Sequence, residues 1–117
     1  CPVSTTTTRG TVFNLGLEHT RGHFVKAMLE GIGFNLRWIF EIYKKDFGFN
    51  PQKIRAIGGG SVNEQWMQGI ANITGKTVET ISQPTMAGAL GAAACVFVGS
   101  GYFKDFDDIN KIIKVSL

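Results

Sequence analysis

The sequence predicts an α/β domain in which helices pack on a small sheet. Three observations support this fold class. Apolar residues recur at helical spacing from about residue 20 to residue 45; a strand, a glycine turn and a helix follow one another over residues 53–74; and a second strand follows at residues 77–81. Strand, helix and strand form a βαβ unit, and 117 residues with 44% hydrophobic composition suffice for one compact domain.

The first third of the chain is expected to contain a short strand or extended segment and one long helix. β-branched and aromatic residues alternate loosely over residues 11–17, which favours an extended segment. The helix over residues 20–45 is amphipathic, and its apolar side chains are expected to face the core: Phe24, Met28, Ile32, Leu36, Ile39 and Tyr43. Gly31 and Gly33 each cost about 1 kcal/mol relative to Ala in mid-helix, so we expect a neighbouring element to approach closely there.

The strand over residues 53–57 leads through three glycines into a helix over residues 61–74. Ser61 and Glu64 have the spacing of a capping box, so this helix is expected to begin at Ser61. Gly75 is well placed to end it. The apolar side chains of the helix are expected to point inward: Trp66, Met67, Ile70, Ala71 and Ile73.

Two further helices are expected after the second strand. One is rich in small residues and runs from Thr85 or Met86 to about Val98; the other begins near Asp105, where carboxylates suit a helix N-terminus. Two strands are few for a complete sheet, and the chain opens on Cys1 and a polar threonine run. We therefore expect a piece of a longer protein.

Charge and composition exclude several function classes. The net charge is +3, but Lys and Arg are scattered among acidic residues, so the sequence predicts no nucleic-acid partner. The apolar run from Ala87 to Val98 is shorter than the roughly 20 residues that cross a bilayer, so no membrane association is expected. The two cysteines form no disulfide framework, which favours the cytoplasm, and Cys95 is expected to be a buried, unreactive thiol.

The glycine turn is the strongest candidate for a binding site. Gly58, Gly59 and Gly60 stand at the carboxyl end of a strand and directly before a helix, where backbone can approach a ligand and helix N–H groups attract phosphate. The same glycines would also serve a plain tight turn, and spacing alone leaves both interpretations open. Asn63 stands where a dinucleotide fingerprint needs its third glycine, and Gly75-Lys76-Thr77 lacks the first glycine of a Walker A loop.

Neither a metal site nor a catalytic residue is expected in this chain. His19 and His23 are four residues apart, but no further ligands accompany them, so capping or packing roles are favoured over a metal site built by the protein. Each acidic residue is explained by a solvated face, a cap or a helix end, and none pairs with another beside the glycine turn. The chain is expected to bind and not to catalyse.

Several stretches together resemble a known family. In order and spacing they are similar to the C-terminal domain of the FGGY carbohydrate kinases: Gly58-Gly59-Gly60-Ser61-Val62-Asn63-Glu64-Gln65-Trp66, Gly75-Lys76-Thr77-Val78 and Ala87-Gly88-Ala89-Leu90-Gly91-Ala92-Ala93. The upstream stretches resemble the xylulokinase branch: Arg9-Gly10-Thr11-Val12-Phe13, His19-Thr20-Arg21-Gly22-His23 and Leu29-Glu30-Gly31. The resemblance covers nearly the whole chain.

The resemblance implies an RNase H-like fold of the actin ATPase type, with two domains and ATP held between them. Residues 1–117 would form much of the C-terminal, nucleotide-binding domain, and the N-terminal sugar-binding domain would lie outside this chain. Gly59 and Gly60, in the turn that starts at Gly58, would lie against the phosphates and ribose of ATP, and Asn63 would face the adenine. Mg²⁺, the acidic phosphate loop and the catalytic aspartate would belong to the whole enzyme.

The implied function is the ATP-dependent phosphorylation of a ketopentose such as D-xylulose, with the fragment alone inactive. Other polyols or ketoses remain open as substrates. A non-catalytic actin-like interaction module is a second interpretation, and a nucleic-acid-binding domain ranks last. An apolar interface left by the missing domain would favour self-association, so a homodimer is among the expected partners.

Overall fold

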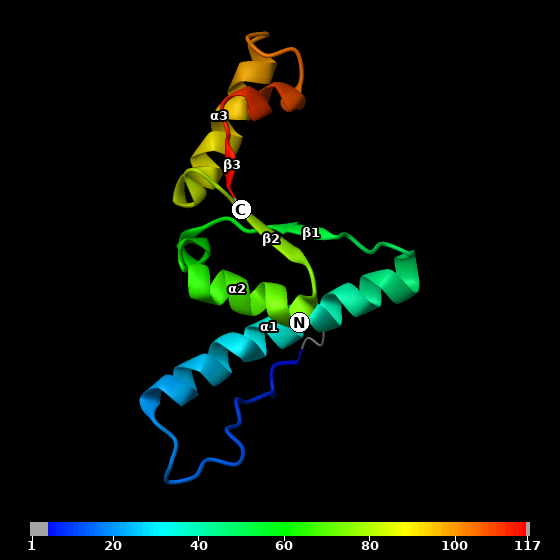
Figure 1. The fold of residues 1–117 in the computed structure, drawn as a ribbon. Coiled ribbons are helices and arrows are strands. Elements are labelled where there is room, and N and C mark those ends of the chain that lie inside the picture. Colours follow the sequence, from blue (N-terminus) through cyan, green and yellow to red (C-terminus); the bar gives the residue numbers. More distant parts are fainter. Residues whose placement is uncertain (1–4, 117) are drawn as a thin grey trace.

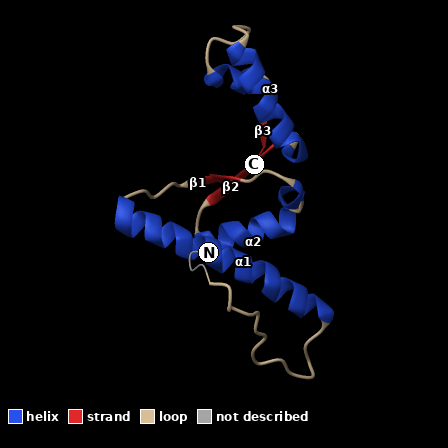
Figure 2. Cartoon of the chain, turned by 180° about the vertical axis from the view of Figure 1, so that it is seen from behind, coloured by secondary structure: helices blue, strands red, loops and turns tan. Residues whose placement is uncertain are grey.

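The structure, a computed structural model, describes residues 5–116, and it is elongated, with extents of 61 × 33 × 29 Å. A small sheet crosses its middle. The helices α1 and α2 pack against each other on one side of the sheet, and α3 stands on the other side (Figures 1 and 2). The elements in order are α1 (Arg21–Phe47), β1 (Lys53–Arg55), η1 (Gly59–Val62), α2 (Glu64–Thr74), β2 (Thr77–Ile81), η2 (Pro84–Met86), α3 (Ala87–Gly99), η3 (Phe106–Lys111) and β3 (Val115–Ser116), where η denotes a 3-10 helix.

The sheet has the strand order β1-β2-β3 in the described part of the chain. β1 and β2 are parallel, with Ile54 opposite Val78, and α2 is the connection between them, so the predicted βαβ unit is confirmed. β2 occupies the predicted residues, whereas β1 ends at Arg55, two residues early. The antiparallel strand β3 was not predicted, because two residues carry no readable alternation.

The strand predicted over residues 11–17 is wrong. This segment is an exposed loop, in which Leu17 has no shielding at all and Asn14 adopts a left-handed backbone conformation with φ 58°. A residue in that conformation breaks an extended run, and β-propensity has little effect where no neighbouring strand offers a partner.

The long helix is confirmed at both ends. α1 begins after Thr20, whose backbone N–H donates to Nδ1 of His23 at 3.1 Å. It ends at Gly48, which adopts φ 66° and donates its N–H to the carbonyl of Tyr43. Gly75 ends α2 in the same way with φ 67°, as the sequence predicted, because both positions need the left-handed conformation that glycine tolerates.

The predicted inner face of α1 is mostly wrong. Phe24, Met28 and Ile32 are 43%, 60% and 46% exposed, and Tyr43 is exposed as well. The side of α1 that meets α2 is centred on Gly33, where an added Cβ would lie 2.7 Å from Cδ1 of Ile73. Apolar side chains occur on the side of α1 with Phe24 and Met28 and also on the side with Gly33. The side with Gly33 packs on α2, because a residue without a side chain lets the two helices approach closely. The expected close approach is therefore found at Gly33 but not at Gly31, which has open space around it.

The C-terminal third stands apart from α1 and α2 (Figure 1). α3 packs through Ala94, which is buried, and through Phe97, whose ring lies 5.1 Å from that of the buried Phe103. Cys95 is exposed, so the prediction of a buried thiol is wrong. Small apolar side chains are buried only where another element packs on them, and none of the residues 5–116 covers this side of α3. The last helix begins after Asp105 as expected, but it is a 3-10 helix.

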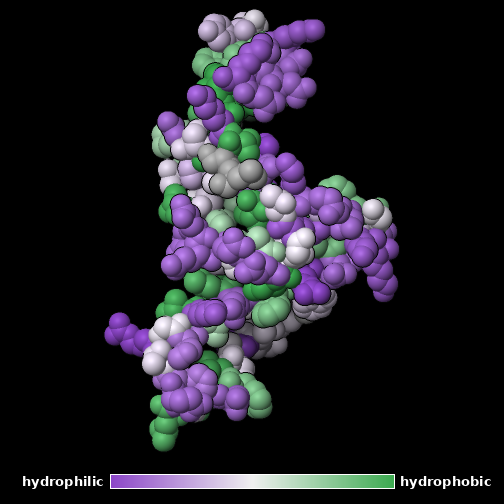
Figure 3. Space-filling model, viewed as in Figure 1, coloured by the Kyte–Doolittle hydropathy of each residue, from purple (hydrophilic) through white to green (hydrophobic). Residues whose placement is uncertain are grey.

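Apolar side chains are left on the surface in large number. Those that are buried in the described residues are few, namely Ile70, Ile81, Ala94 and Phe103. Figure 3 shows apolar side chains interspersed with polar ones over one face of the molecule. None of the described helices is long and apolar enough to span a bilayer.

One ion-pair cluster lies across the two parallel strands. Glu79 on β2 is 7% exposed and accepts a hydrogen bond from Nζ of Lys53 at 2.6 Å, and Nη2 of Arg55 lies 3.6 Å from its other oxygen. The hydrogen bond from Lys53 is the main cause that lowers the pKa of the Glu79 carboxyl below 4.5. The carboxylate thereby joins β1 to β2 through side chains as well as through the backbone.

The lowered pKa of Glu79 predicts a loss of stability in acid. A carboxyl whose pKa is lower in the folded than in the unfolded state stabilises the fold above its unfolded pKa, and that contribution disappears as the pH falls through the folded value. Urea unfolding from neutral pH to below about pH 4 should show this loss. Glu79→Gln should be less stable at neutral pH and should have a shallower acid slope, whereas an unchanged slope would contradict the assignment. The pKa of the Asp108 carboxyl is lowered as well, mainly by its hydrogen bond from Lys111, so Asp108→Asn measures the part of the acid slope that comes from this second carboxyl.

The contact between α1 and α2 predicts opposite outcomes for two glycines on one helix. Gly33→Leu should lower the free energy of unfolding by about 1–3 kcal/mol, because the new side chain meets Ile73. Gly31→Ala should raise it by up to about 1 kcal/mol, because the site is open and Ala favours the helix. Thermal or urea unfolding of the two variants measures both values. Equal effects at the two sites would contradict the packing described here.

Candidate functional site

The glycine turn is held from both sides by hydrogen bonds. Gly58 has φ 91°, a conformation that only glycine adopts readily, and its N–H donates to the carbonyl of Pro84 at 2.7 Å. Ser61 is buried, and its Oγ donates to the carbonyl of Gly58 at 2.8 Å. Gly59 and Gly60 open the 3-10 helix η1, where the first N–H groups have no partner within the helix. The turn is rigid, yet it keeps backbone donors free at its start.

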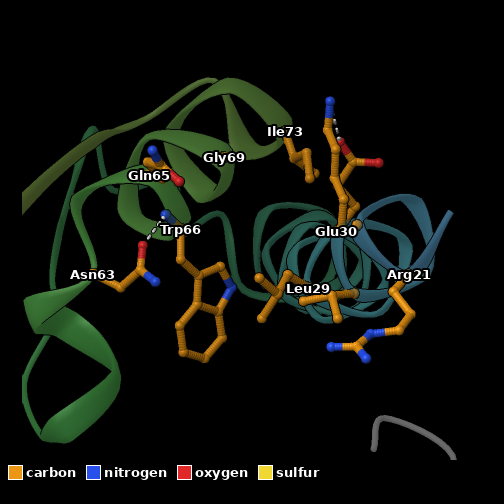
Figure 4. Close-up of a pocket in the computed structure, with 11 residues that line it drawn as sticks. Arg21, Leu29, Glu30, Asn63, Gln65, Trp66, Gly69 and Ile73 are labelled. Carbon is orange, nitrogen blue, oxygen red and sulfur yellow. Dashed lines mark hydrogen bonds and ion pairs between the residues drawn. The ribbon is translucent and has the colours of Figure 1, made fainter.

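Asn63, not Ser61, caps the helix that follows. Oδ1 of Asn63 accepts a hydrogen bond from the N–H of Trp66 at 2.9 Å, and α2 begins at Glu64. The predicted start at Ser61 is wrong because its hydroxyl is engaged with Gly58 and its backbone belongs to the preceding 3-10 turn. The cap fixes the side chain of Asn63 with its Nδ2 on the side of the Trp66 indole (Figure 4).

A pocket of about 660 Å³ lies between the N-terminal part of α1 and α2, from Asn63 at the start of α2 to Ile73 near its end. Its α1 wall combines apolar and charged side chains, and its α2 wall contains Asn63 and Trp66 (Figure 4). The lining residues are Arg21, Gly22, Val25, Lys26, Leu29, Glu30, Asn63, Gln65, Trp66, Gly69 and Ile73. Lys26 and Glu30 form an ion pair of 3.7 Å along the helix. Apolar walls with a few polar groups and this volume are typical of a site for a small organic molecule.

The structure brings only one of the four predicted binding residues into this pocket. Asn63 lines it, whereas Gly58, Gly59 and Gly60 do not. The three glycines lie beside the pocket. The six-membered ring of Trp66 covers Gly60 on this side, so closely that an added Cβ at Gly60 would collide with the ring. The turn and the pocket are therefore adjacent parts of one surface at the start of α2, with Trp66 between them.

The pocket also contains residues that the sequence did not single out. Arg21, Lys26 and Glu30 come from α1, about 40 residues before α2 in sequence, and their pattern is that of an ordinary solvated helix face. Trp66 was expected in the core, but it is only half-buried and forms a wall of the pocket. No local signal marks such residues, because the site exists only once the two helices have packed together.

The two histidines have structural roles at the start of α1. Nδ1 of His23 accepts the N–H of Thr20, and Nδ1 of His19 accepts the N–H of Gly16 at 2.9 Å. Their rings are in edge contact, with centroids 5.7 Å apart. These are capping and packing interactions, the alternative that the sequence favoured over a metal site. Among residues 5–116, no three His, Cys, Asp or Glu side chains are grouped to hold a metal ion.

Comparison with known proteins gives concordant matches. Residues 1–100 match the model of the FGGY family of carbohydrate kinases, C-terminal domain. A glycerol kinase of Pseudothermotoga lettingae is 38% identical over 105 residues, which are 88% of this chain and 20% of that protein. A xylulose kinase of Bacillus subtilis is 31% identical over 107 residues, which are 92% of this chain and 21% of that protein.

A solved structure matches as well. The crystal structure of a xylulose kinase from Rhodospirillum rubrum superposes with a TM-score of 0.76 at 30% identity, over 95% of this chain and 22% of that one. The chain thus spans about a fifth of the length of the relatives that it matches. Since the family model covers most of the chain, from the loop before α1 to the end of α3, the chain belongs to the FGGY family of carbohydrate kinases, and residues 1–100 match its C-terminal domain.

Proposed function

We propose that this chain is the nucleotide-binding domain of an ATP-dependent sugar kinase with an RNase H-like, actin-type fold. The observation that carries the proposal is the position of the pocket of about 660 Å³: it runs along α2 and reaches the N-terminus of this helix at Asn63, beside a glycine turn that opens with free backbone donors. Helix starts and 3-10 turns of this kind favour phosphate groups, and the adjoining apolar pocket has room for a base. The proposal places the protein in the cytoplasm.

The proposed nucleotide lies across the junction between turn and pocket. Its adenine occupies the pocket, where Nδ2 of Asn63 is available as a donor because Oδ1 is used by the helix cap. Its ribose and phosphates extend toward Gly59 and Gly60, which carry no side chains to obstruct them. Arg21 on the α1 wall adds a positive charge that favours an anionic ligand, whereas the charge of Lys26 is balanced by Glu30.

The residues described here do not fit a magnesium site, since no three His, Cys, Asp or Glu side chains gather in residues 5–116. Our proposal therefore assigns the magnesium ligands, the acidic phosphate loop and the aspartate base to an N-terminal, sugar-binding domain of a longer protein. The contribution of this chain is to bind and orient the nucleotide, and alone it is inactive in phosphoryl transfer.

The proposed substrate is a ketopentose such as D-xylulose. The flanking stretches of the sequence and the likeness to the xylulose kinases of B. subtilis and R. rubrum support it. The likeness to glycerol kinase from P. lettingae supports a polyol instead, so glycerol belongs in the same test. A non-catalytic actin-like module is the alternative if no sugar is phosphorylated.

The first test is ATP turnover by the full-length protein with a panel of ketoses and polyols. D-xylulose should be phosphorylated fastest, and the isolated chain of 117 residues should bind ATP in calorimetry without turning it over. Turnover only with glycerol would correct the substrate while keeping the kinase. ATP binding without turnover on any sugar would favour the interaction module.

Asn63 allows the cap to be separated from the ligand contact. Asn63→Asp keeps the oxygen that caps α2 and removes the amide donor, so stability should be retained while ATP affinity falls by about tenfold. Asn63→Ala should lose both, with an unfolding free energy lower by about 1 kcal/mol. Urea unfolding and calorimetry measure the two effects. Unchanged ATP affinity in Asn63→Asp would remove Asn63 from the proposed site.

The exposed side of α1 predicts self-association of the isolated chain. Phe24, Met28, Ile32, Phe34 and Trp38 are all more than 40% exposed, and apolar surface of this extent attracts a second copy. Light scattering should show a homodimer or larger species whose mass rises with concentration. Phe24→Lys combined with Met28→Lys should weaken it, whereas Asn110→Lys adds charge elsewhere and should not. A monomer at high concentration would contradict the prediction.

A further inference from the structure

Trp66 occupies the junction between the glycine turn and the pocket. Its backbone N–H donates to Oδ1 of Asn63, and this hydrogen bond holds the backbone of Trp66 in the first turn of α2. The indole then reaches back over the turn, where its six-membered ring lies against Gly60; atoms Cε3 and Cη2 would be 3.3 Å from a Cβ at that position, and Cζ3 would be nearer still. The ring therefore sets the position of the Gly60 backbone.

The indole N–H of Trp66 has no partner. Nε1 is buried and makes no hydrogen bond to any described residue. A tryptophan that only fills a core normally pairs this donor or leaves it in water, since an unpaired buried donor is unfavourable. Figure 4 shows the nitrogen on the edge of the ring that faces α1, across the space that the pocket occupies. An acceptor atom of a ligand bound in the pocket would satisfy this donor.

We propose that Trp66 is a positioning residue of the nucleotide site, with its ring fixing Gly60 and its indole N–H donating to an acceptor atom of the bound nucleoside. This inference rests on the proposed function. Nε1 is covered in the free chain, so the ring has to shift before this donor can reach a ligand, and the same ring is in contact with Gly60. Occupation of the base pocket and placement of the phosphate-facing turn are thereby coupled through one side chain.

Two substitutions separate the roles of the ring and of its N–H. Trp66→Phe removes the donor and keeps a smaller aromatic ring on the same Cβ, with part of the contact to Gly60 lost, so ADP affinity should fall by at least about two- to tenfold, the effect of one hydrogen bond. Trp66→Leu also removes the ring, so it should weaken ADP binding further and, in the absence of ligand, increase hydrogen exchange of the Ser61 and Asn63 amides, which donate to the carbonyls of Gly58 and Gly60. Trp38→Phe is the matched control, because Trp38 is 51% exposed on α1 and outside the pocket.

The Trp38→Phe background also gives a direct optical signal. The chain has two tryptophans, so Trp66 is then the single source of indole fluorescence. ADP and adenosine should both change its emission, because both carry the nucleoside that would meet the indole. Wild-type ADP affinity in Trp66→Phe, or emission that does not respond to bound ADP, would overturn the inference and leave the proposed function intact. Absence of ADP binding by the unmodified chain would instead overturn nucleotide binding, and with it the ligand bond assigned to Trp66.

Discussion

The packing of α1 on α2 at Gly33 is the contact on which the candidate site depends. Ile73 from α2 occupies the space that a side chain at Gly33 would take, and this close approach sets the separation of the two helices. The same pair of helices forms the walls of the pocket, which Ile73 itself lines, with Leu29 on one side and Trp66 on the other (Figure 4). Any change in the separation at Gly33 therefore changes the width of the pocket, although Gly33 does not line it.

The second constraint is the backbone path from β1 into α2. Parallel pairing with β2 fixes where β1 ends, and the positive φ of Gly58 turns the chain there toward the helix. Ser61 donates a hydrogen bond to the carbonyl of Gly58, and the N–H of Gly58 donates to the carbonyl of Pro84; together these bonds hold the backbone of the turn. Asn63 then determines where α2 begins. The candidate binding residues are thus positioned by the sheet, while the pocket walls are positioned by helix packing.

The sequence predicts those features that local physics decides. Glycine in the left-handed conformation ended α2 where it was expected, at Gly75, and alternation located β2. The errors occur where distant packing decides. Ser61 satisfied the spacing of a capping box but was already engaged with Gly58, and the apolar stripe through Phe24 was larger than the side of α1 that packs. Cys95 looked buried because its neighbours are small and apolar, yet no described element covers it.

The site was predictable in part for the same reason. The glycine turn and Asn63 form one continuous stretch of sequence, so their motif could be read directly, whereas Arg21 and Lys26 join them only through the fold. Trp66 belongs to both groups: it lies three residues from Asn63 in sequence, but the role proposed for it follows from a ring that contacts Gly60 and a donor that has no partner among the described residues. An apolar residue at core spacing and a ligand-facing residue have the same sequence pattern. They differ in whether the polar atom of the side chain is satisfied by the protein, and only the folded structure reveals that difference.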